Sequence, residues 1–434
     1  MPTLRHIALL WAAALAITPS LAEDTTSVPD GVTYITGTKN QPTTNLPPTN
    51  LYPNFTSTTD SISQAAVTDE AEAEATDAVT TITGSSALPS NATETPTSTA
   101  AEEPAPTNTR PCNGYPELCE RKFSNVTQVG CHNSPFARAG SVAANQELPV
   151  TDQLNDGVRF LQAQIQWPNN DTVPHFCHTM CELFDAGPIT DWLTQVREWV
   201  AAHPYDVVTI LLGNGNYSTP DMYVPYIEAS GITKYVFTPS KVPLRRDDWP
   251  TLGQMILSGQ RVVMFLDYMA NQTAYPWLLD EFTHMWETPF DPVDRTFPCT
   301  VHRPPELPQD LARDGYLYLM NHNLNAEIQL LGQTILVPAV SELNTTNAAD
   351  GEGSLGMAAA NCAADWGRPP TVLNVDYYNY GNYPGSVFEV AARMNNVPYE
   401  PRPCCGQGES GAGRVGGVEW IVLWLGVAWA VWML

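Results

Sequence analysis

Between residues 111 and 403, short apolar runs alternate with amphipathic stretches along the chain. Some of these runs have the length and the branched side chains of β-strands, namely 158–165, 207–212, 261–266, 316–320 and 372–375. Residues 189–202 instead space their apolar side chains as a helix does, with Asp191 near the start. Strands that alternate with helices predict βα units around a parallel sheet, and the length of the segment suits a single (β/α)8 barrel.

The two ends of the chain differ from this pattern and indicate a secreted protein. Residues 1–22 have a basic start, an apolar centre and a small-residue cleavage site, which predicts a signal peptide. Residues 23–110 are rich in Ser, Thr and Pro, so we expect a disordered, mucin-like stalk or an unmodified spacer. Residues 404–434 place small residues around Ser410 before an uncharged apolar tail. This layout predicts a GPI-attachment signal, with a short transmembrane anchor as the alternative.

The net charge bears on the class of partner, and the cysteines bear on the cellular compartment. The 434 residues carry a formal net charge of −26, which argues against nucleic acid and gives no attraction to anionic lipid. Nine cysteines suit an oxidising route, and the odd number means that at least one is unpaired or joins another chain. Cys112 and Cys119 are close enough to close a small loop, and we expect Cys177 and Cys181 in structural disulfides rather than in a metal site. Glycosylation sequons begin at Asn54, Asn91, Asn125, Asn170, Asn216, Asn271 and Asn344.

Two histidines carry the strongest candidate chemistry. His132 in Gly-Cys-His-Asn-Ser and His178 in Cys-His-Thr-Met-Cys each close an apolar run that predicts a strand. Two imidazoles placed in this way can serve as the base and the acid of one phosphoryl transfer. Asp376 ends a third run, where its carboxylate could orient one of them. The remaining strand ends carry Gln164, Asn214 and Asp267, so we expect one shared site at the C-terminal ends of the strands.

These blocks, in this order and spacing, resemble the phosphatidylinositol-specific phospholipase C superfamily, in particular its secreted, fungal-type PLC-like phosphodiesterases. Residues 130–134 resemble the family's G-T-H-[DN]-S block, residues 157–161 look like the strand that follows it, and Asp376-Tyr377-Tyr378-Asn379 is similar to a late Asp-Tyr segment of bacterial members. The resemblance covers residues 123 to about 397. It implies a distorted (β/α)8 barrel that cleaves the phosphodiester of an inositol phospholipid.

The resemblance also implies a role for each catalytic side chain. His132 would take a proton from the inositol 2-hydroxyl, which then attacks phosphorus to give a cyclic phosphate. His178 would protonate the departing diacylglycerol oxygen, and Asp376 would orient His132 and stabilise its imidazolium. The ordinary pKa of an imidazole lies near neutrality, so both histidines suit these roles at ordinary pH.

The positions that neutralise the phosphate depart from the family. Gln162 and Gln164 stand where members carry calcium-binding carboxylates, or the Asp and Arg of metal-free members. Neutral amides bind Ca²⁺ far less well than carboxylates, so we predict no cofactor, with a weak Ca²⁺ site as the alternative. The predicted substrate-binding residues are Asn133, Gln162, Gln164, Asn214, Asp267 and Tyr377.

Other polar side chains near the predicted strands are weaker candidates for the active site. Arg138 is a candidate replacement for the missing cation, whereas Arg159 is interpreted as a strand-start residue. His322 follows another predicted strand and could line the pocket, and His175 is interpreted as structural or as part of the rim.

Three hypotheses of function remain. The first is a monomeric, GPI-anchored phosphodiesterase at the cell surface, acting on an inositol phospholipid or a GPI-like glycan lipid. The second, favoured by Gln162 and Gln164, is a catalytically weak or inactive barrel that serves as a surface-binding or cell-wall protein. The third is another barrel that cleaves phosphodiesters, such as a glycerophosphodiester or sphingolipid phosphodiesterase. Such enzymes need Glu and Asp ligands for a divalent metal, which the glutamine-rich strand does not offer.

Overall fold

Parallel β-strands curl around a common axis in a computed structural model that describes residues 52–53, 110–168, 172–330 and 333–406. The strands pair in the order β7-β6-β5-β2-β1-β12-β9-β8. Their bounds are β1 (Gln128–Cys131), β2 (Phe160–Gln166), β5 (Val208–Gly213), β6 (Val262–Leu266), β7 (Leu278–Asp280), β8 (Met285–Glu287), β9 (Leu317–Asn321) and β12 (Val372–Val375). Each pair along this order is parallel. The described residues therefore form an α/β barrel, and it is distorted because β7 and β8, at the two ends of the order, do not pair with each other.

The strands predicted from apolar runs are present. The runs 158–165, 207–212, 261–266, 316–320 and 372–375 correspond to β2, β5, β6, β9 and β12. All residues of β5, β6, β9 and β12 are buried. Strands of a parallel sheet that is covered on both faces need apolar residues on both faces, which explains why these runs are continuous rather than alternating.

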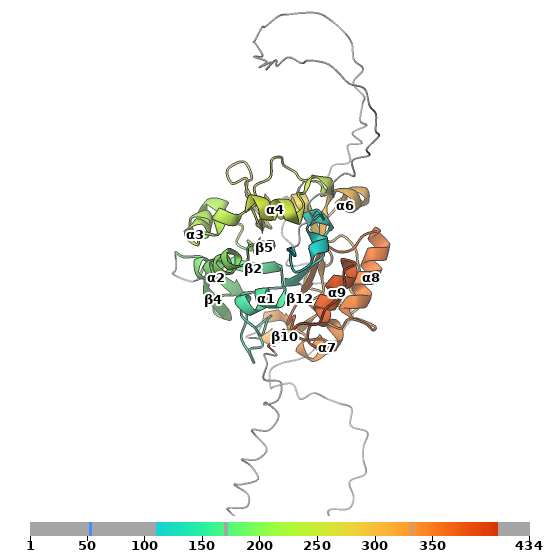
Figure 1. Ribbon diagram of the computed structural model, residues 1–434. Coiled ribbons are helices and arrows are strands. Elements are labelled where there is room, and N and C mark those ends of the chain that lie inside the picture. The colour runs from blue at the N-terminus through green and yellow to red at the C-terminus, as the bar shows by residue number, and fades with distance from the viewer. Residues whose placement is uncertain (1–51, 54–109, 169–171, 331–332, 407–434) are drawn as a thin grey trace, which may run out of the picture.

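Helices cover the outside of the barrel, with α2 and α3 on one side and α8 and α9 on the other (Figure 1). The helix predicted over 189–202 is α2 (Ile189–Ala202), and its regularly spaced apolar side chains are buried. The other helices are α1 (Val150–Asp156), α3 (Val224–Ala229), α4 (Leu252–Ser258), α5 (Glu281–His284), α6 (Gln309–Gly315), α7 (Leu343–Thr346), α8 (Leu355–Trp366) and α9 (Ser386–Met394). Short 3-10 helices span Pro116–Leu118, Phe123–Asn125, Pro220–Met222, Ile232–Tyr235, Arg246–Asp248 and Val340–Glu342.

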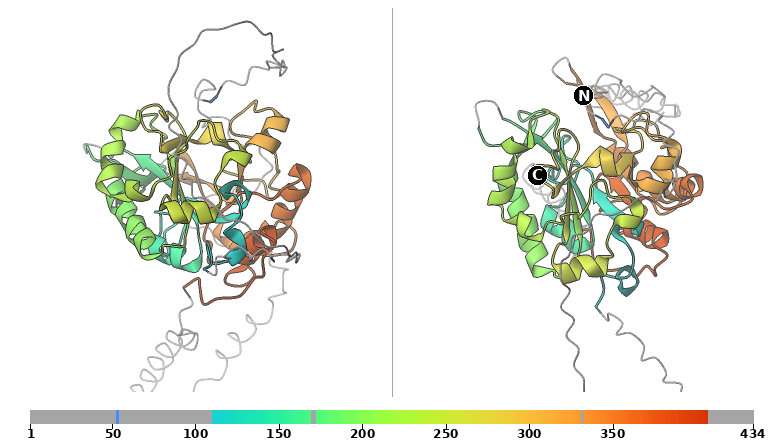
Figure 2. Two further views of the ribbon diagram at one scale, coloured as in Figure 1. Left: turned by 45° about the horizontal axis from the view of Figure 1, so that its top comes forward. Right: turned by 90° about the horizontal axis from the view of Figure 1, so that it is seen from above.

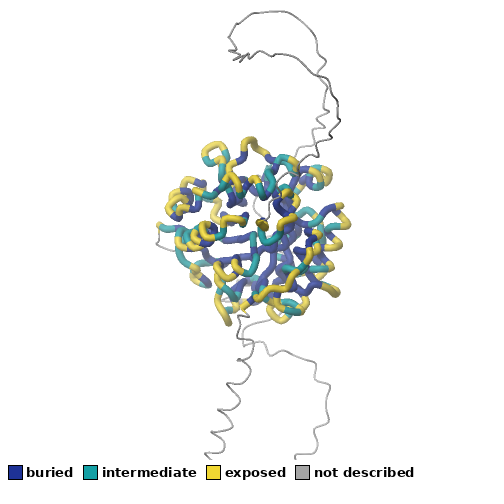
Figure 3. The backbone as a smooth tube through the Cα atoms, viewed as in Figure 1, coloured by how far each residue is buried: buried dark blue, intermediate teal, exposed yellow. Residues whose placement is uncertain are grey.

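The two ends of the barrel differ in what fills them. Inward-facing side chains such as Phe160, Leu211 and Leu319 form one apolar cluster with Phe123 and Trp249, which fills the end where the strands begin. The opposite end, where the strands finish, is called the mouth below. In Figure 1, α4 and α6, which precede strands, lie at the first end, and β10 and α7, which follow β9, lie at the mouth. The sheet is buried and the exposed residues gather on the outer loops (Figure 3).

Two antiparallel hairpins extend the barrel beyond the mouth. β3 (His175–His178) pairs with the end of β2, where Phe176 lies opposite Ile165, and then with β4 (Phe184–Pro188). β10 (Asn325–Leu330) and β11 (Gln333–Pro338) form the second hairpin, which projects from the body in the right-hand view of Figure 2. The expectation that His178 ends a parallel barrel strand is therefore wrong. The chain passes the mouth in β2 and turns back, and His178 returns to the mouth at the end of β3.

A buried ion pair lies beside the opening between β7 and β8. The guanidinium of Arg303 donates from Nε and Nη2 to Glu287 Oε2, at 2.9 and 2.7 Å, and from Nη1 to the Tyr268 hydroxyl at 3.0 Å. Tyr52, which belongs to the predicted stalk, is buried against the rings of Tyr268 and Phe282. Its hydroxyl lies 3.1 Å from that of Tyr268. Backbone ladder bonds are absent between β7 and β8 in the described residues, so side-chain contacts such as these hold this side of the barrel.

The cysteine predictions are confirmed within the described residues. Cys112 pairs with Cys119 and Cys177 with Cys181, and two further disulfides join Cys299 to Cys362 and Cys404 to Cys405. Cys131 is the free, buried cysteine among the described residues. The described sequon asparagines, Asn125, Asn216, Asn271 and Asn344, are exposed. The predicted signal peptide, the apolar tail and nearly all of the predicted stalk lie outside the described residues.

Replacing Arg303 by methionine is expected to lower the free energy of unfolding by about 3–5 kcal/mol, because Glu287 would be left as an unpaired charge in the interior. Chemical denaturation of the full chain measures this loss. Arg313→Met is the control, since Arg313 faces Asp310 at 3.7 Å in an exposed pair whose loss costs about 0–1 kcal/mol. Equal, small losses in both variants would contradict the stabilising role of the buried pair. The double variant Arg303→Met/Glu287→Met should recover most of the loss.

Candidate active site

His132 and Asp376 meet at the mouth because β1 and β12 pair in register. Cys131 lies opposite Val375 in the parallel ladder, and the His132 backbone N–H donates to the Val375 carbonyl at 2.9 Å. The next residue on each strand therefore projects into the barrel beside the other. Both side chains are buried, with exposed fractions of 4 % for His132 and 1 % for Asp376.

The hydrogen bonds around this pair define which ring nitrogen of His132 is free. His132 Nδ1 lies 2.8 Å from Asp376 Oδ1, and Asn145 Nδ2 donates to the same oxygen at 2.9 Å. A carboxylate only accepts hydrogen bonds, so Nδ1 carries the proton that faces Asp376. In the neutral ring, Nε2 then holds the lone pair. This is the arrangement of a general base that a carboxylate orients.

Electrostatics favour the protonated form of His132. Burial lowers the pKa of this imidazole, but the charge and the hydrogen bond of Asp376 raise it, with smaller contributions from Asp291 and Glu287. The attraction outweighs the burial, and the pKa of His132 lies above its ordinary value. The imidazolium that forms when the base takes a proton is therefore stabilised in place.

His178 approaches the mouth from the β2–β3 hairpin and sits in apolar surroundings. It is buried, and the ring of Phe136 contacts it edge-on, with centroids 5.3 Å apart. Burial, together with the charge of His132, lowers the pKa of His178 to about 4. Phe136, which contacts His178, follows His132 by four residues, so the two histidines lie at the same end of the barrel. His178 Nδ1 is buried without a hydrogen-bond partner in the described structure.

Of the two arginines weighed from the sequence, Arg138 lies on the His178 side of the mouth. Its guanidinium stacks on the Phe184 ring at 4.0 Å, and that ring packs on Phe136, which contacts His178. Arg138 itself is exposed. Arg159 precedes β2 at the opposite end of the barrel and pairs with Asp206 at 2.8 Å, as its interpretation as a strand-start residue requires.

A chain of amide hydrogen bonds crosses the barrel interior beneath the histidines. Asn374 Nδ2 donates to Gln162 Oε1 at 2.8 Å and to Asn321 Oδ1 at 3.2 Å, and Asn321 donates to Glu287 Oε2 at 3.1 Å. Gln162 is therefore held inside the protein by Asn374. Gln164 lies in the last barrel pairing of β2, opposite Gly213, where only a residue without a side chain leaves room for its amide.

The remaining predicted substrate-binding residues fall into two groups. Asn133 Oδ1 is buried without a partner, and Asp267 is a buried carboxylate whose pKa is raised to about 7 by burial, a rise that Arg303 partly offsets. Asn133 thus has an unused acceptor, whereas Asp267 Oδ1 already accepts from the backbone N–H groups of Asn214 and Tyr268, each at 2.7 Å. The amide of Asn214 instead bonds Ser218, Tyr223 and Tyr268, and the Tyr377 hydroxyl donates to the Ala144 carbonyl at 2.9 Å. Asn214 and Tyr377 thus shape the loops, and the structure does not aim their bonded polar atoms at the histidines.

Two asparagine amides flank the His132–Asp376 pair and were not predicted from the sequence. His322, which was a candidate from the sequence, faces away from the pair. Asn145 and Asn323 each place Nδ2 3.3 Å from His132 Nδ1. His322 is buried against Phe297 with Nε2 2.9 Å from the Thr346 carbonyl, away from the pair. Successive residues at a strand end face opposite sides. The alternation Asn321-His322-Asn323 could therefore have indicated that Asn323 faces the barrel interior. His175 pairs with Asp185 in the β3–β4 hairpin.

The donor set at the mouth does not suit a divalent cation. Ca²⁺ requires six to eight oxygens, several of them from carboxylates. Gln162 Oε1 already accepts from Asn374, and Gln164 supplies a neutral amide in place of a carboxylate. Among the described residues, no group of three or more His, Cys, Asp or Glu side chains is placed to hold a metal ion.

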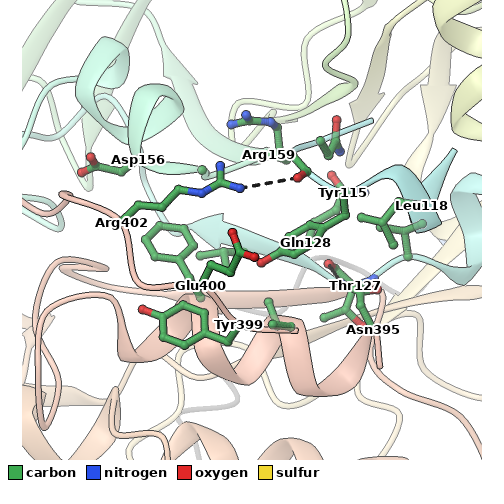
Figure 4. A pocket seen from close by; sticks show the side chains of 18 of the residues that line it. Tyr115, Leu118, Thr127, Gln128, Asp156, Arg159, Asn395, Tyr399, Glu400 and Arg402 are labelled. Atoms are coloured by element: carbon green, nitrogen blue, oxygen red, sulfur yellow. Dashed lines mark hydrogen bonds between the residues drawn. The ribbon is translucent and has the colours of Figure 1, made fainter. Parts of the chain in front are cut away.

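A separate cavity of about 120 Å³ lies at the opposite end of the barrel. Its lining includes Thr127 and Gln128 at the start of β1, and Figure 4 shows Tyr115, Glu400 and Arg402 around it. Arg402 Nη2 lies 3.5 Å from the Gly114 carbonyl at its edge. None of the predicted catalytic residues lines this cavity.

The chain is similar to a known protein family and to two proteins of Arthroderma benhamiae. A family model described as PI-PLC X matches residues 118–395. A protein of Arthroderma benhamiae named as an uncharacterized secreted protein is 50% identical over 335 residues, which is 76% of this chain and 74% of that protein. A second protein of that organism, named PI-PLC X domain-containing protein 1, is 40% identical over 288 residues, which is 66% of this chain and 90% of that protein.

Solved structures show a weaker likeness. The phosphatidylinositol-specific phospholipase C of Listeria monocytogenes aligns with a TM-score of 0.40 and 11% identity, over 63% of this chain and 94% of that chain. The family model and the two relatives carry the assignment, and they confirm the resemblance inferred from the sequence blocks around His132 and Asp376. The chain belongs to the PI-PLC X-domain family.

Proposed function

We propose that this protein is a phosphodiesterase that cleaves inositol phospholipids, or glycan-bearing lipids built on them, by acid–base catalysis. The observation that carries the proposal is the carboxylate-oriented His132, whose Nε2 holds the lone pair, at the same end of the barrel as a second buried histidine. That histidine, His178, contacts Phe136, which follows His132 by four residues. Membership of the PI-PLC X-domain family supports the reaction class.

The proposed reaction uses the inositol 2-hydroxyl as the nucleophile. His132 Nε2 accepts the hydroxyl proton while the oxygen attacks phosphorus, and Asp376 stabilises the imidazolium that results. The bond from phosphorus to the diacylglycerol oxygen breaks, and His178 gives that oxygen its proton. The products are a cyclic inositol phosphate and diacylglycerol. Proton exchange with water then restores both histidines.

The low pKa of His178 has a consequence for this scheme. An acid with a pKa of about 4 is largely unprotonated at neutral pH, so free enzyme in the correct state for catalysis is a minor fraction. A phosphodiester anion beside the ring favours its charged form and raises this pKa in the complex. Substrate binding thereby prepares the acid. Arg138, stacked on Phe184 near His178, is the proposed contact for the phosphate charge.

The exposed apolar side chains suggest how the mouth meets a lipid surface. Several of them follow the C-terminal ends of barrel strands, namely Val142, Tyr217, Met222, Met269 and Tyr380. We propose that they contact the membrane that holds the substrate, and that a GPI anchor retains the protein there. No helix in the described part of the chain is long and apolar enough to cross a membrane. A catalytically inactive surface-binding barrel is the alternative, since Gln162 and Gln164 supply neutral amides and no charge to offset that of a phosphate.

Alanine substitution of either histidine should remove the release of cyclic inositol phosphate from labelled phosphatidylinositol. Each loses a proton-transfer group, so the expected fall in kcat is on the order of a hundredfold or more. The full secreted chain is assayed as wild type, His132→Ala and His178→Ala, with and without Ca²⁺. His203→Ala serves as the control, because His203 stacks on Trp199 and precedes β5 at the opposite end of the barrel. Equal background in all four proteins would favour the binding-protein alternative.

Asp376→Asn should move the high-pH limb of the kcat/KM profile to lower pH. Catalysis needs His132 neutral and His178 protonated. Because the base has the higher pKa of the two, the fraction of enzyme in this state rises with pH up to about 4, stays level between the two pKa values, and falls above the pKa of His132. Removing the carboxylate lowers the pKa of His132 and shifts that upper limb down, with a reduced maximum because the ring loses its orientation. A profile from pH 3 to pH 9, measured on mixed micelles, tests this. An upper limb that stays in place would exclude His132 as its source.

Arg138→Gln should lower kcat by about tenfold to a hundredfold with a smaller change in KM, because the charge acts on the developing negative charge at phosphorus. Arg138→Lys should restore part of the loss. The control is Arg402→Gln, an arginine at the far cavity shown in Figure 4. A KM effect without a kcat effect would assign Arg138 to uniform binding of the lipid headgroup instead.

A further inference from the structure

The loop that carries His178 is closed on itself by a disulfide. Cys177 and Cys181, four positions apart, are joined, and His178 directly follows Cys177 at the end of β3. Within the closed loop the Met180 backbone N–H donates to the His178 carbonyl at 2.6 Å. The proposed acid therefore lies inside a short covalent ring of the chain, and its backbone has little freedom to move away from the mouth.

A side chain of β2 ties this loop to the wall of the barrel. Gln166 Nε2 donates to the carbonyls of Cys177 and Thr179, at 3.2 and 3.0 Å. These two carbonyls belong to the residues on either side of His178. One amide thus fixes the peptide groups before and after the histidine, and it does so from a strand that pairs with β5 up to Gln164.

The backbone of the closed loop needs such restraint. Thr179, which follows His178, has a φ of 58°, in the left-handed region that a β-branched residue rarely adopts. A residue in this region stays there only where its surroundings hold it. The disulfide and the amide of Gln166 supply that hold, so we expect Thr179 to relax and to carry His178 with it when the disulfide is removed.

The two histidines of the candidate site differ in how their rings are held. Asp376 orients His132 through Nδ1, at 2.8 Å. The Nδ1 of His178 is instead buried without a hydrogen-bond partner among the described residues, and its ring contacts that of Phe136 edge-on. An edge contact fixes a ring less firmly than a hydrogen bond to a carboxylate. The position of His178 therefore depends on the backbone to which it is attached.

We propose that the Cys177–Cys181 disulfide and Gln166 are positioning elements, which hold His178 against Phe136 at the mouth in place of an orienting carboxylate. The catalytic consequence rests on the proposed function. An acid must lie within roughly 2.6–3.2 Å of the atom that it protonates. A misplacement of about 1 Å can cost on the order of a hundredfold in rate, so a loop that loses its disulfide leaves the acid out of reach.

Two substrates with different leaving groups separate the position of the acid from the stability of the fold. Phosphatidylinositol releases an alkoxide that needs a proton, whereas a nitrophenyl ester of inositol 1-phosphate releases a phenolate that is stable without one. In the full secreted chain, Cys177→Ala/Cys181→Ala should lower kcat for phosphatidylinositol by about tenfold to a hundredfold, with little change for the nitrophenyl ester. Gln166→Met should show the same selectivity with a smaller fall.

The matched control is Cys112→Ala/Cys119→Ala. This disulfide also closes a short loop, with a separation of seven residues, and both of its cysteines belong to the apolar cluster at the opposite end of the barrel. Its removal should change the two rates by the same factor or leave both as they are, because it affects the stability of the chain and not the position of His178.

A measurement that needs no turnover reports the position of His178 directly. Nuclear magnetic resonance of the chain with ¹³C-labelled histidine follows the titration of each ring, and His178→Ala assigns the signal. Burial holds the pKa of His178 at about 4 in the intact chain. A ring released into water should titrate closer to the ordinary value of about 6.5 in Cys177→Ala/Cys181→Ala, and should not shift in the control.

The outcomes separate this proposal from the proposed function. A loss confined to phosphatidylinositol, together with a raised pKa of His178, supports the positioning role. Equal losses on both substrates, unchanged rates, or an unchanged titration of His178 would overturn it and leave the disulfide as a support of the fold alone. If the wild-type chain cleaves neither substrate, the proposed function fails, and the titration of His178 by itself decides whether the disulfide positions this ring.

Discussion

The parallel pairing of β1 with β12 is the constraint on which the candidate active site depends. These strands are separated by about 240 residues in sequence, and ladder hydrogen bonds fix them at Cys131 opposite Val375. A shift of one residue would turn His132 or Asp376 to the helix-facing side, because side chains alternate across a strand. The distance of 2.8 Å between His132 Nδ1 and Asp376 Oδ1 thus follows from backbone register. His132 and Asp376 directly follow the ends of these two strands, which keeps the imidazole oriented before any ligand arrives.

A polar layer lies between the apolar filling of the barrel and its mouth. Asn374 donates to both Gln162 and Asn321 across the axis, and Asn321 donates in turn to Glu287. Buried amides in a connected network are stable only in one arrangement, so the layer fixes the side chains on which the histidines rest. Arg303 ends the network beside the opening between β7 and β8. The Arg303–Glu287 ion pair thus contacts both the side of the barrel between β7 and β8 and the amide layer beneath the candidate site.

Local sequence pattern predicted the parts of the fold that depend on local rules. The continuous apolar runs of β5, β6, β9 and β12 follow from burial on both faces, and the spacing in α2 follows from its single buried stripe. The pattern could not predict that β3 turns back on β2, because a short apolar run is the same in a parallel or an antiparallel strand. The contacts of Asn145 with Asp376 and of Arg303 with Glu287 depend on tertiary folding and leave no signal in a single sequence.

The charges at the mouth are unbalanced until an anion enters. In the structure, the base has a raised pKa and the proposed acid has a lowered one, partly because a positive His132 opposes a second positive charge on His178. A phosphodiester between the rings would attract both charges and reduce their mutual repulsion. It would raise the pKa of His178 toward the range in which an acid works, while the Asp376 carboxylate stabilises the charge that His132 gains when it takes a proton. With neutral Gln162 and Gln164 near this mouth, the proposed reaction would then rely on the bound phosphodiester for part of its electrostatic preparation.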